Sequence, residues 1–68
     1  MRCDTFYVLT NNENYEFLDQ DGYTTDNLLS AERFDGVKEA GEEQLSLDEP
    51  SKYDVVRVTL QYNLQKIS

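Results

Sequence analysis

From Val56 to Gln65, apolar and polar residues alternate without a break. Successive side chains of a β-strand point to opposite faces, so this period of two predicts a strand with one buried face and one solvent-exposed face. The apolar set is Val56, Val58, Leu60, Tyr62 and Leu64, and the polar set is Arg57, Thr59, Gln61, Asn63 and Gln65. We expect a helix to cover the apolar face.

Two earlier segments are also predicted to be strands. Residues 5–10 are rich in β-branched and aromatic residues and are apolar on both faces, which indicates a central strand covered on each side. Asn11 to Asn14 is typical of a turn, and Tyr15 to Leu18 is expected to be the returning strand of a hairpin. A second turn follows, in which Gly22 can adopt a positive φ.

One helix is predicted between this hairpin and the final strand. Asp26 is expected to cap a short helical turn, and Asp35 to cap the main helix through its side chain. The apolar face of the main helix follows the spacing i, i+3, i+4, i+7, i+8 and comprises Val37, Ala40, Gly41, Gln44 and Leu45. Pro50 lies in the connection to the last strand.

These elements predict an α+β domain of residues 1–68 in the order strand, strand, helix, strand (ββαβ). We expect a small antiparallel three-stranded sheet, with the last strand beside the first and one helix packed on one face. A chain of 68 residues buries a thin core. Cys3 is the only cysteine and there is no histidine, so neither an intrachain disulfide nor a zinc site is expected.

The charge limits the kind of partner. Fourteen acidic against six basic residues give a formal net charge of −8. Nucleic acids and anionic membranes bind mainly through Lys and Arg, so neither is an expected partner. No segment approaches the roughly 20 apolar residues needed to span a bilayer, and the N-terminus lacks the features of a signal peptide. The protein is therefore expected in the cytoplasm.

Catalysis is not expected. General acid–base chemistry usually depends on histidine, and a Cys nucleophile needs a base or a lowered pKa, whereas Cys3 lies near the N-terminus and is expected among acidic residues. The segment Asp19 to Gly22 resembles a calcium loop only superficially, because the positions that need Gly and Glu hold Thr24 and Ser30. We expect no catalytic residue, no metal and no cofactor.

The acidic residues allow two interpretations. One is a surface that keeps the protein soluble. The other is an acidic face that imitates a phosphate backbone and docks on the basic cleft of a nucleic-acid-binding protein. The candidate residues for such a face are Asp19, Asp21, Asp26, Glu39, Glu42, Glu43, Asp48 and Glu49.

The last strand also suggests self-association. It is predicted to be about twice as long as the first two strands, so half of it would lack a partner within the chain. An exposed strand edge tends to pair with another chain. The candidate residues for a homodimer contact are Val58, Leu60, Tyr62 and Leu64. The alternative is a bulge, a bend or a frayed end after Tyr62.

From Phe6 to Ala40 the chain resembles short, uncharacterised proteins encoded by bacteriophages and prophages. The similarity lies in an apolar strand, a polar turn, Gly22, the run Ala31-Glu32-Arg33-Phe34, and Glu39-Ala40 on a helix. It implies a ββαβ fold and a phage setting in a bacterial host, and no site residues. Phe34 and Ala31 would close the core between hairpin and helix, and Arg33 would meet nearby acids. The expected function is protein binding, with self-association as the alternative.

Overall fold

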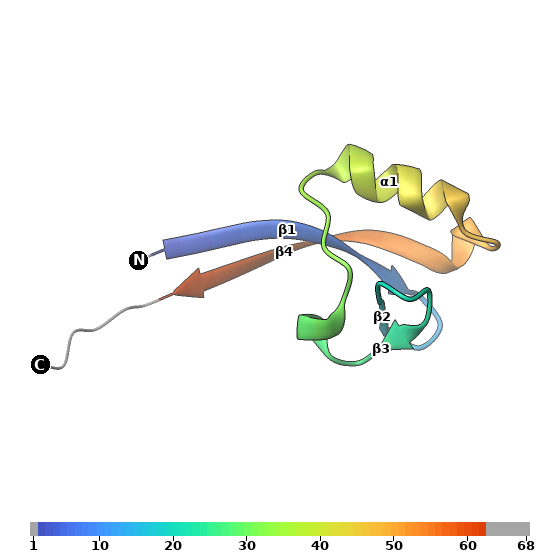
Figure 1. Ribbon diagram of the computed structural model, residues 1–68, viewed down its shortest axis with the longest axis horizontal. Helices are drawn as coiled ribbons and strands as arrows, with labels where there is room; N and C mark the ends of the chain where they lie inside the picture. The colour runs from blue at the N-terminus through green and yellow to red at the C-terminus, as the bar shows by residue number, and fades with distance from the viewer. Residues whose placement is uncertain (1, 63–68) are drawn as a thin grey trace, which may run out of the picture.

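The computed structural model describes residues 2–62 and shows an α+β fold (Figure 1). Four antiparallel strands form one sheet in the order β3-β2-β1-β4. They are β1 (Arg2–Asn11), β2 (Phe17–Leu18), β3 (Thr24–Thr25) and β4 (Tyr53–Tyr62). The helices are α1 (Val37–Ser46) and two short 3₁₀ helices, η1 (Leu28–Ser30) and η2 (Pro50–Lys52). The α+β class is confirmed, but the prediction of three strands was wrong because Thr24 and Thr25 pair with β2.

The long antiparallel pair of β1 and β4 forms most of the sheet. Each β4 residue lies opposite one β1 residue, from Arg2 opposite Tyr62 to Asn11 opposite Tyr53. The predicted antiparallel pairing of the first and last strands is therefore confirmed. The expectation that half of the last strand lacks a partner was wrong for β4. The first strand begins at Arg2, not Thr5, and its polar first residues gave no strand signal. Leu64 lies outside the described residues.

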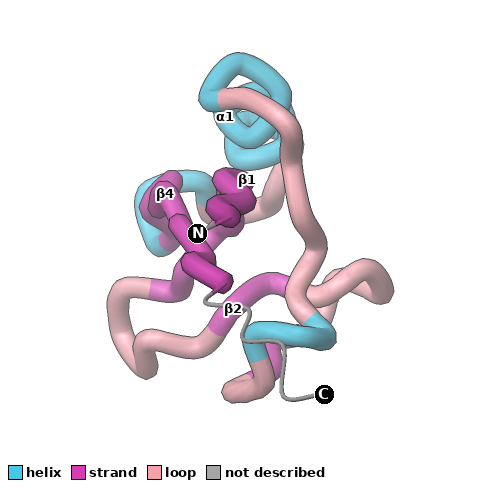
Figure 2. Tube along the Cα trace, turned by 90° about the vertical axis from the view of Figure 1, so that its left-hand side faces the viewer, coloured by secondary structure: helices cyan, strands magenta, loops and turns pink. Residues whose placement is uncertain are grey.

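The sheet is covered on both faces, and the helix lies on the face that the sequence did not indicate (Figure 2). Val58 and Leu60 pack with Phe6 and Val8 on one face, against Ala31 and Leu28. On the other face, Leu9 packs with Leu18 and Ala40 of α1, together with half-buried Tyr7, Phe34, Leu47, Tyr53 and Val55. The helix was therefore predicted on the wrong face, because the 28–31 segment covers the Val58 row.

The orientation of α1 also differs from the prediction. Ala40 is fully buried, whereas Val37 is 56% and Leu45 is 76% exposed. Gln44, which was predicted on the same face, anchors the helix by donating to the backbone carbonyl of Tyr53 at the start of β4. The expected Asp35 cap was wrong, since the N-cap is Gly36 and makes no side-chain hydrogen bond. The Glu39 carboxylate fills the place to which a Cβ at position 36 would point.

The connection between β3 and α1 contributes residues to the cores on both faces of the sheet. Asn27, not Asp26, caps η1, because its side chain accepts from the backbone N–H of Leu29. Phe34 pairs through its backbone with Tyr7, with N–O distances of 2.8 and 2.9 Å. Ala31 and Phe34 thus belong to cores on opposite faces of the sheet. Arg33 lies over the ring of Phe6, 4.3 Å from its centroid, and not in an ion pair among the described residues.

Candidate functional site: an acidic end of the molecule

Three irregular segments meet at the end of the molecule that holds β2, β3 and the C-terminus of α1 (Figure 1). The first is the Asp19–Gly22 turn. The Asp19 carboxylate accepts from the backbone N–H groups of Asp21 and Tyr23, each at 2.9 Å, and Gly22 has a φ of 88°. The prediction of a positive φ at Gly22 is confirmed. A side chain at this position would be strained, so glycine lets the turn close.

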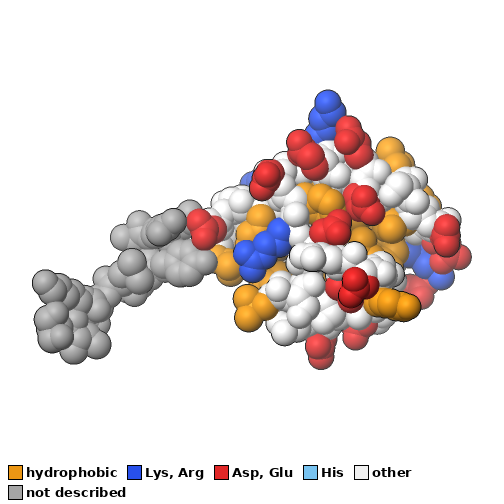
Figure 3. Space-filling view, in the orientation of Figure 1, with side chains coloured by type: hydrophobic (Ala, Val, Ile, Leu, Met, Phe, Trp, Pro, Cys, Tyr) orange, Lys and Arg blue, Asp and Glu red, His pale blue; other side chains and the backbone are white. Residues whose placement is uncertain are grey.

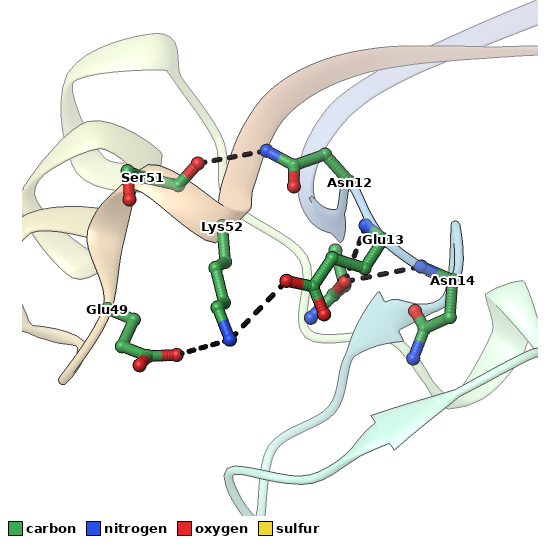
Figure 4. Close-up of polar contacts among 7 residues, drawn as sticks. Asn12, Glu13, Asn14, Glu49, Ser51 and Lys52 are labelled. Atoms are coloured by element: carbon green, nitrogen blue, oxygen red, sulfur yellow. Dashed lines mark hydrogen bonds and ion pairs between the residues drawn. The ribbon is translucent and has the colours of Figure 1, made fainter.

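The second segment is the turn after β1, which contains Asn12 and Glu13, and the third is the segment from Asp48 to Lys52 before β4. Lys52 joins the two (Figure 4). Its Nζ lies 2.8 Å from Oε2 of Glu49 and 3.4 Å from Oε1 of Glu13. Asn12 links the same segments, since its backbone N–H donates to the carbonyl of Lys52 and its side chain to that of Ser51. Hydrogen bonds to Glu49 and Glu13 raise the pKa of Lys52 above its usual value.

Glu32 adds a half-buried carboxylate to this end. Its backbone N–H donates to the carbonyl of Leu18 at 3.0 Å, next to the bridge between Ala31 and Asp19. Burial raises the pKa of Glu32 above its ordinary value of 4.5, and the negative charges of Glu43 and Asp19 raise it further. Part of this rise therefore reflects repulsion of Glu32 by carboxylates from two other segments.

We call this group the acidic end. It comprises Glu13, Asp19, Asp21, Glu32, Glu43, Asp48 and Glu49. Within residues 2–62, Lys52 is the base that makes ion pairs with it. Arg33 and Arg57 instead lie over the rings of Phe6 and Tyr7.

Two solvent-open hollows flank the Asp19–Gly22 turn. One, of about 350 Å³, is lined by Leu18, Gly22, Leu47, Asp48, Glu49 and Tyr53. The other, of about 510 Å³, is lined by Asp19, Gln20, Asp21, Thr24, Thr25, Leu29 and Ser30. Each hollow thus presents two carboxylates on a polar surface. Within the described part of the chain, no group of three or more Cys, Asp or Glu side chains is placed to hold a metal ion.

The eight acidic residues expected to share a face do not all come together. Five belong to the acidic end: Asp19, Asp21, Glu43, Asp48 and Glu49. Asp26, Glu39 and Glu42 are exposed, and no described contact or hollow joins them to that group. In the view of Figure 3, acidic side chains lie in separate groups over the surface. Sequence reasoning missed Glu13 and Glu32, whose positions depend on long-range contacts.

The residues expected to mediate self-association lie on β4. Val58 and Leu60 are half-buried against the Phe6 core, and Val56 of the same row is 37% exposed. Tyr62 is the last residue of β4, and Leu64 lies beyond the described range. Since β4 is the outer strand, its second edge has no strand partner among residues 2–62.

The chain matches no protein-family model, no curated protein and no solved structure. Among the helices of residues 2–62, none has the length and apolar character needed to cross a membrane.

The raised pKa of Glu32 predicts a pH-dependent gain in stability for Glu32→Gln. The folded protein holds the Glu32 proton more tightly than the unfolded chain, so the wild-type free energy of unfolding falls as pH rises from 4.5 through the raised pKa. The variant lacks this loss. It should therefore be more stable than the wild type at pH 7, and the difference should vanish below pH 4.5.

Chemical denaturation of both proteins across this pH range measures the difference. Glu42→Gln removes an exposed carboxylate from α1 and is the matched control, with no comparable pH-dependent gain expected. If Glu32→Gln and Glu42→Gln behave alike, the pKa of Glu32 is not raised in solution by burial or by its acidic neighbours.

Proposed function

We propose that this protein acts by binding another protein, with the acidic end as its docking surface. Its partner in this proposal is a basic, nucleic-acid-binding factor of a bacterial host, and the protein itself is an accessory protein of a phage or mobile element. It works in the cytoplasm and catalyses no reaction. The observation that supports the proposal is the convergence of carboxylates from separate segments on one end, with Lys52 between two of them.

This convergence is more than solubility requires. Dispersed acidic residues keep a protein soluble, whereas carboxylates brought close together repel one another and lower stability. Burial raises the pKa of Glu32, and repulsion from Glu43 and Asp19 adds to that rise. A protein retains such a cost more readily when the charges serve an interaction. A basic partner would remove the repulsion on binding and would thereby stabilise the acidic end.

The carboxylates that line the two hollows indicate that the partner would bring basic side chains. Asp48 and Glu49 line one hollow, and Asp19 and Asp21 line the other. Lys and Arg side chains that normally contact phosphate groups could enter both, since carboxylates and phosphates accept the same charge-assisted hydrogen bonds. Attraction between the net charge of −8 and a basic cleft would also speed association at low salt.

Capture from bacterial lysate tests this proposal. The immobilised protein is incubated with nuclease-treated lysate and eluted with increasing salt, and the eluted proteins are identified by mass spectrometry. We expect a basic nucleic-acid-binding protein that elutes only at high salt, because salt screens the attraction. If the captured proteins stay bound even at the highest salt concentration, or if none of them is basic, the acidic end is not the docking surface.

A second function is self-association through β4. It is favoured by a different observation, namely that this long strand lies at the edge of the sheet.

A further inference from the structure

The two edges of the sheet differ in how they are protected. At one edge, β3 has only two residues, Thr24–Thr25, and a strand this short offers little to a second chain. At the other edge, β4 runs for ten residues, and each is opposite one residue of β1 without a bulge. In Figure 1 the helix and the β2–β3 region lie on either side of the β1–β4 pair. The outer edge of β4 has no strand partner among residues 2–62.

Most of the features that block an edge strand are missing from β4. Its sequence, YDVVRVTLQY, contains no Pro, no Gly and no Lys. Proteins generally use prolines, charged side chains (especially lysines), bulges or very short strands to prevent pairing with another chain. The two charged residues are Asp54 and Arg57, and the Arg57 guanidinium is turned toward β1, 6.0 Å from the centre of the Tyr7 ring. This edge is therefore open to a further strand.

Charge favours this edge over the rest of the surface for contact between two copies. Each copy has a net charge of −8, so most surfaces repel their equivalents. Asp54 is the one acidic residue of β4, and Arg57 balances it. Two copies that meet along β4 thus place neutral stretches together and keep both acidic ends, which lie on other segments, out of the contact. Salt would weaken the remaining long-range repulsion.

Symmetry restricts the possible registers. Two identical strands that extend a sheet in antiparallel fashion are related by a twofold axis perpendicular to the sheet. Opposed side chains lie on the same face, and faces alternate along the strand. The register must therefore be centred on one residue that lies opposite its own equivalent in the second copy, and it cannot be centred between two residues. Within Tyr53–Tyr62, only registers centred on Arg57 or Val58 pair nine residues. Centring on Arg57 opposes two like charges, which is destabilising.

We propose that two copies of this chain pair antiparallel along their β4 edges, centred on Val58, and form a continuous eight-stranded sheet. In this register Val58 is opposite Val58 of the second copy, and Val56 is opposite its Leu60. The half-buried row of each copy is thereby continued by the row of the other, and Val56, 37% exposed, gains an apolar neighbour. The proposal does not depend on the acidic end.

The register makes a distinctive prediction at Thr59, which is exposed and lies opposite Arg57 of the second copy. Thr59→Glu would place a carboxylate against that guanidinium, and Thr59→Lys would place two cations together. Each dimer contains two such pairs. At roughly 0.2–1 kcal/mol a pair, Thr59→Glu should tighten the dimer and Thr59→Lys should weaken it, each by about two- to thirtyfold. Net charge alone predicts the reverse, because Thr59→Glu makes each copy more negative.

Analytical ultracentrifugation of the wild type and both variants, up to high micromolar concentration and at low and high salt, is the test. We expect a wild-type dimer that strengthens with salt and the order Glu tighter than wild type, wild type tighter than Lys. A strictly monomeric wild type would overturn the proposal, and so would the opposite order of the variants. Amide hydrogen exchange of the wild type provides a check that needs no variant: protection in β4 should rise with protein concentration.

Discussion

Leu9→Ala is expected to lower the free energy of unfolding by about 3–4 kcal/mol, which is most of the stability of so small a domain. Leu9 is fully buried between the sheet and α1, where it packs with Leu18 and Ala40. Truncation of a buried leucine costs about 2–5 kcal/mol, because apolar contacts are lost and a cavity remains. A core this small typically supplies only about 3–5 kcal/mol of stability. Urea unfolding followed by circular dichroism measures the loss.

Leu45→Ala is the matched control for this change. The sequence pattern assigned Leu45 to the apolar face of the helix, whereas the structure leaves its side chain 76% exposed. An exposed leucine gains little from burial, so its truncation should change stability by no more than about 0.5 kcal/mol. Equal losses for Leu9→Ala and Leu45→Ala would show that α1 is rotated relative to the structure described above.

Replacing glycine by alanine at two positions should change stability in opposite directions. Gly22 has a φ of 88° in the turn after β2, and a Cβ there is strained, so Gly22→Ala should destabilise the protein by about 1–2 kcal/mol. Gly41 lies inside α1, and a Cβ built on it meets no atom within 4 Å apart from its chain neighbours and the backbone of its own helix. Gly41→Ala should therefore stabilise the helix by about 1 kcal/mol.

Thermal unfolding of both variants beside the wild type gives the comparison. A destabilising Gly41→Ala would indicate that another surface packs closely against the helix at this position. A neutral Gly22→Ala would indicate that the Asp19–Gly22 turn adopts a different conformation in solution.

Local signals in the sequence predicted individual elements better than their contacts. The alternation from Val56 predicted β4, and the Asn-rich turn predicted the hairpin from β1 to β2. The pairing of first and last strands was also predicted. What failed was the choice of face. Val58 and Leu60 were expected beneath the helix, but Ala31 and Leu28 cover them, and Val55 and Tyr53 face α1.

The failure on α1 has a physical cause. Val37 and Leu45 fit the periodic pattern, but α1 contacts the sheet through Ala40, a small residue that permits close approach. Gln44 does lie on the predicted face, but it holds the helix there through a hydrogen bond from its amide to the backbone carbonyl at the start of β4. Periodicity counts apolar residues and cannot register this hydrogen bond.

The acidic end was predictable only in part. The charge and its candidate residues were visible in composition, but Glu13 and Glu32 join the group through Lys52 and through the bridge between Asp19 and Ala31. These contacts link residues far apart in the chain, and the sequence contains no local signal for them. Of the two ion pairs of Lys52, only the one with Glu49 joins residues within one helical turn, so the pair with Glu13 also had no local signal in the sequence.

The two proposed interactions respond to salt in opposite ways. Docking of the acidic end on a basic protein weakens as salt increases, whereas pairing of two negative copies along β4 strengthens. Because the dimer is measured on the purified protein and docking on a captured partner, either proposal can fail while the other holds. The residues of the acidic end lie on segments other than β4, and the register centred on Val58 does not pair Tyr53, which lines one hollow, so both interactions can occur in one assembly.

Two variants with equal net charge test the central claim, that binding depends on where the carboxylates lie. The acidic-end variant has Asp19→Asn, Asp21→Asn, Asp48→Asn and Glu49→Gln. The control variant has Asp26→Asn, Asp35→Asn, Glu39→Gln and Glu42→Gln. Each removes four negative charges from −8 and leaves −4. The amide at position 19 keeps an oxygen that can accept from the N–H groups of Asp21 and Tyr23.

The measurement is the affinity of each variant for the basic protein captured by the wild type, at one fixed salt concentration. We predict that the acidic-end variant loses most of the affinity, while the control variant retains most of it. Equal losses in the two variants would contradict the account, because they would show that the partner responds to net charge and not to the acidic end.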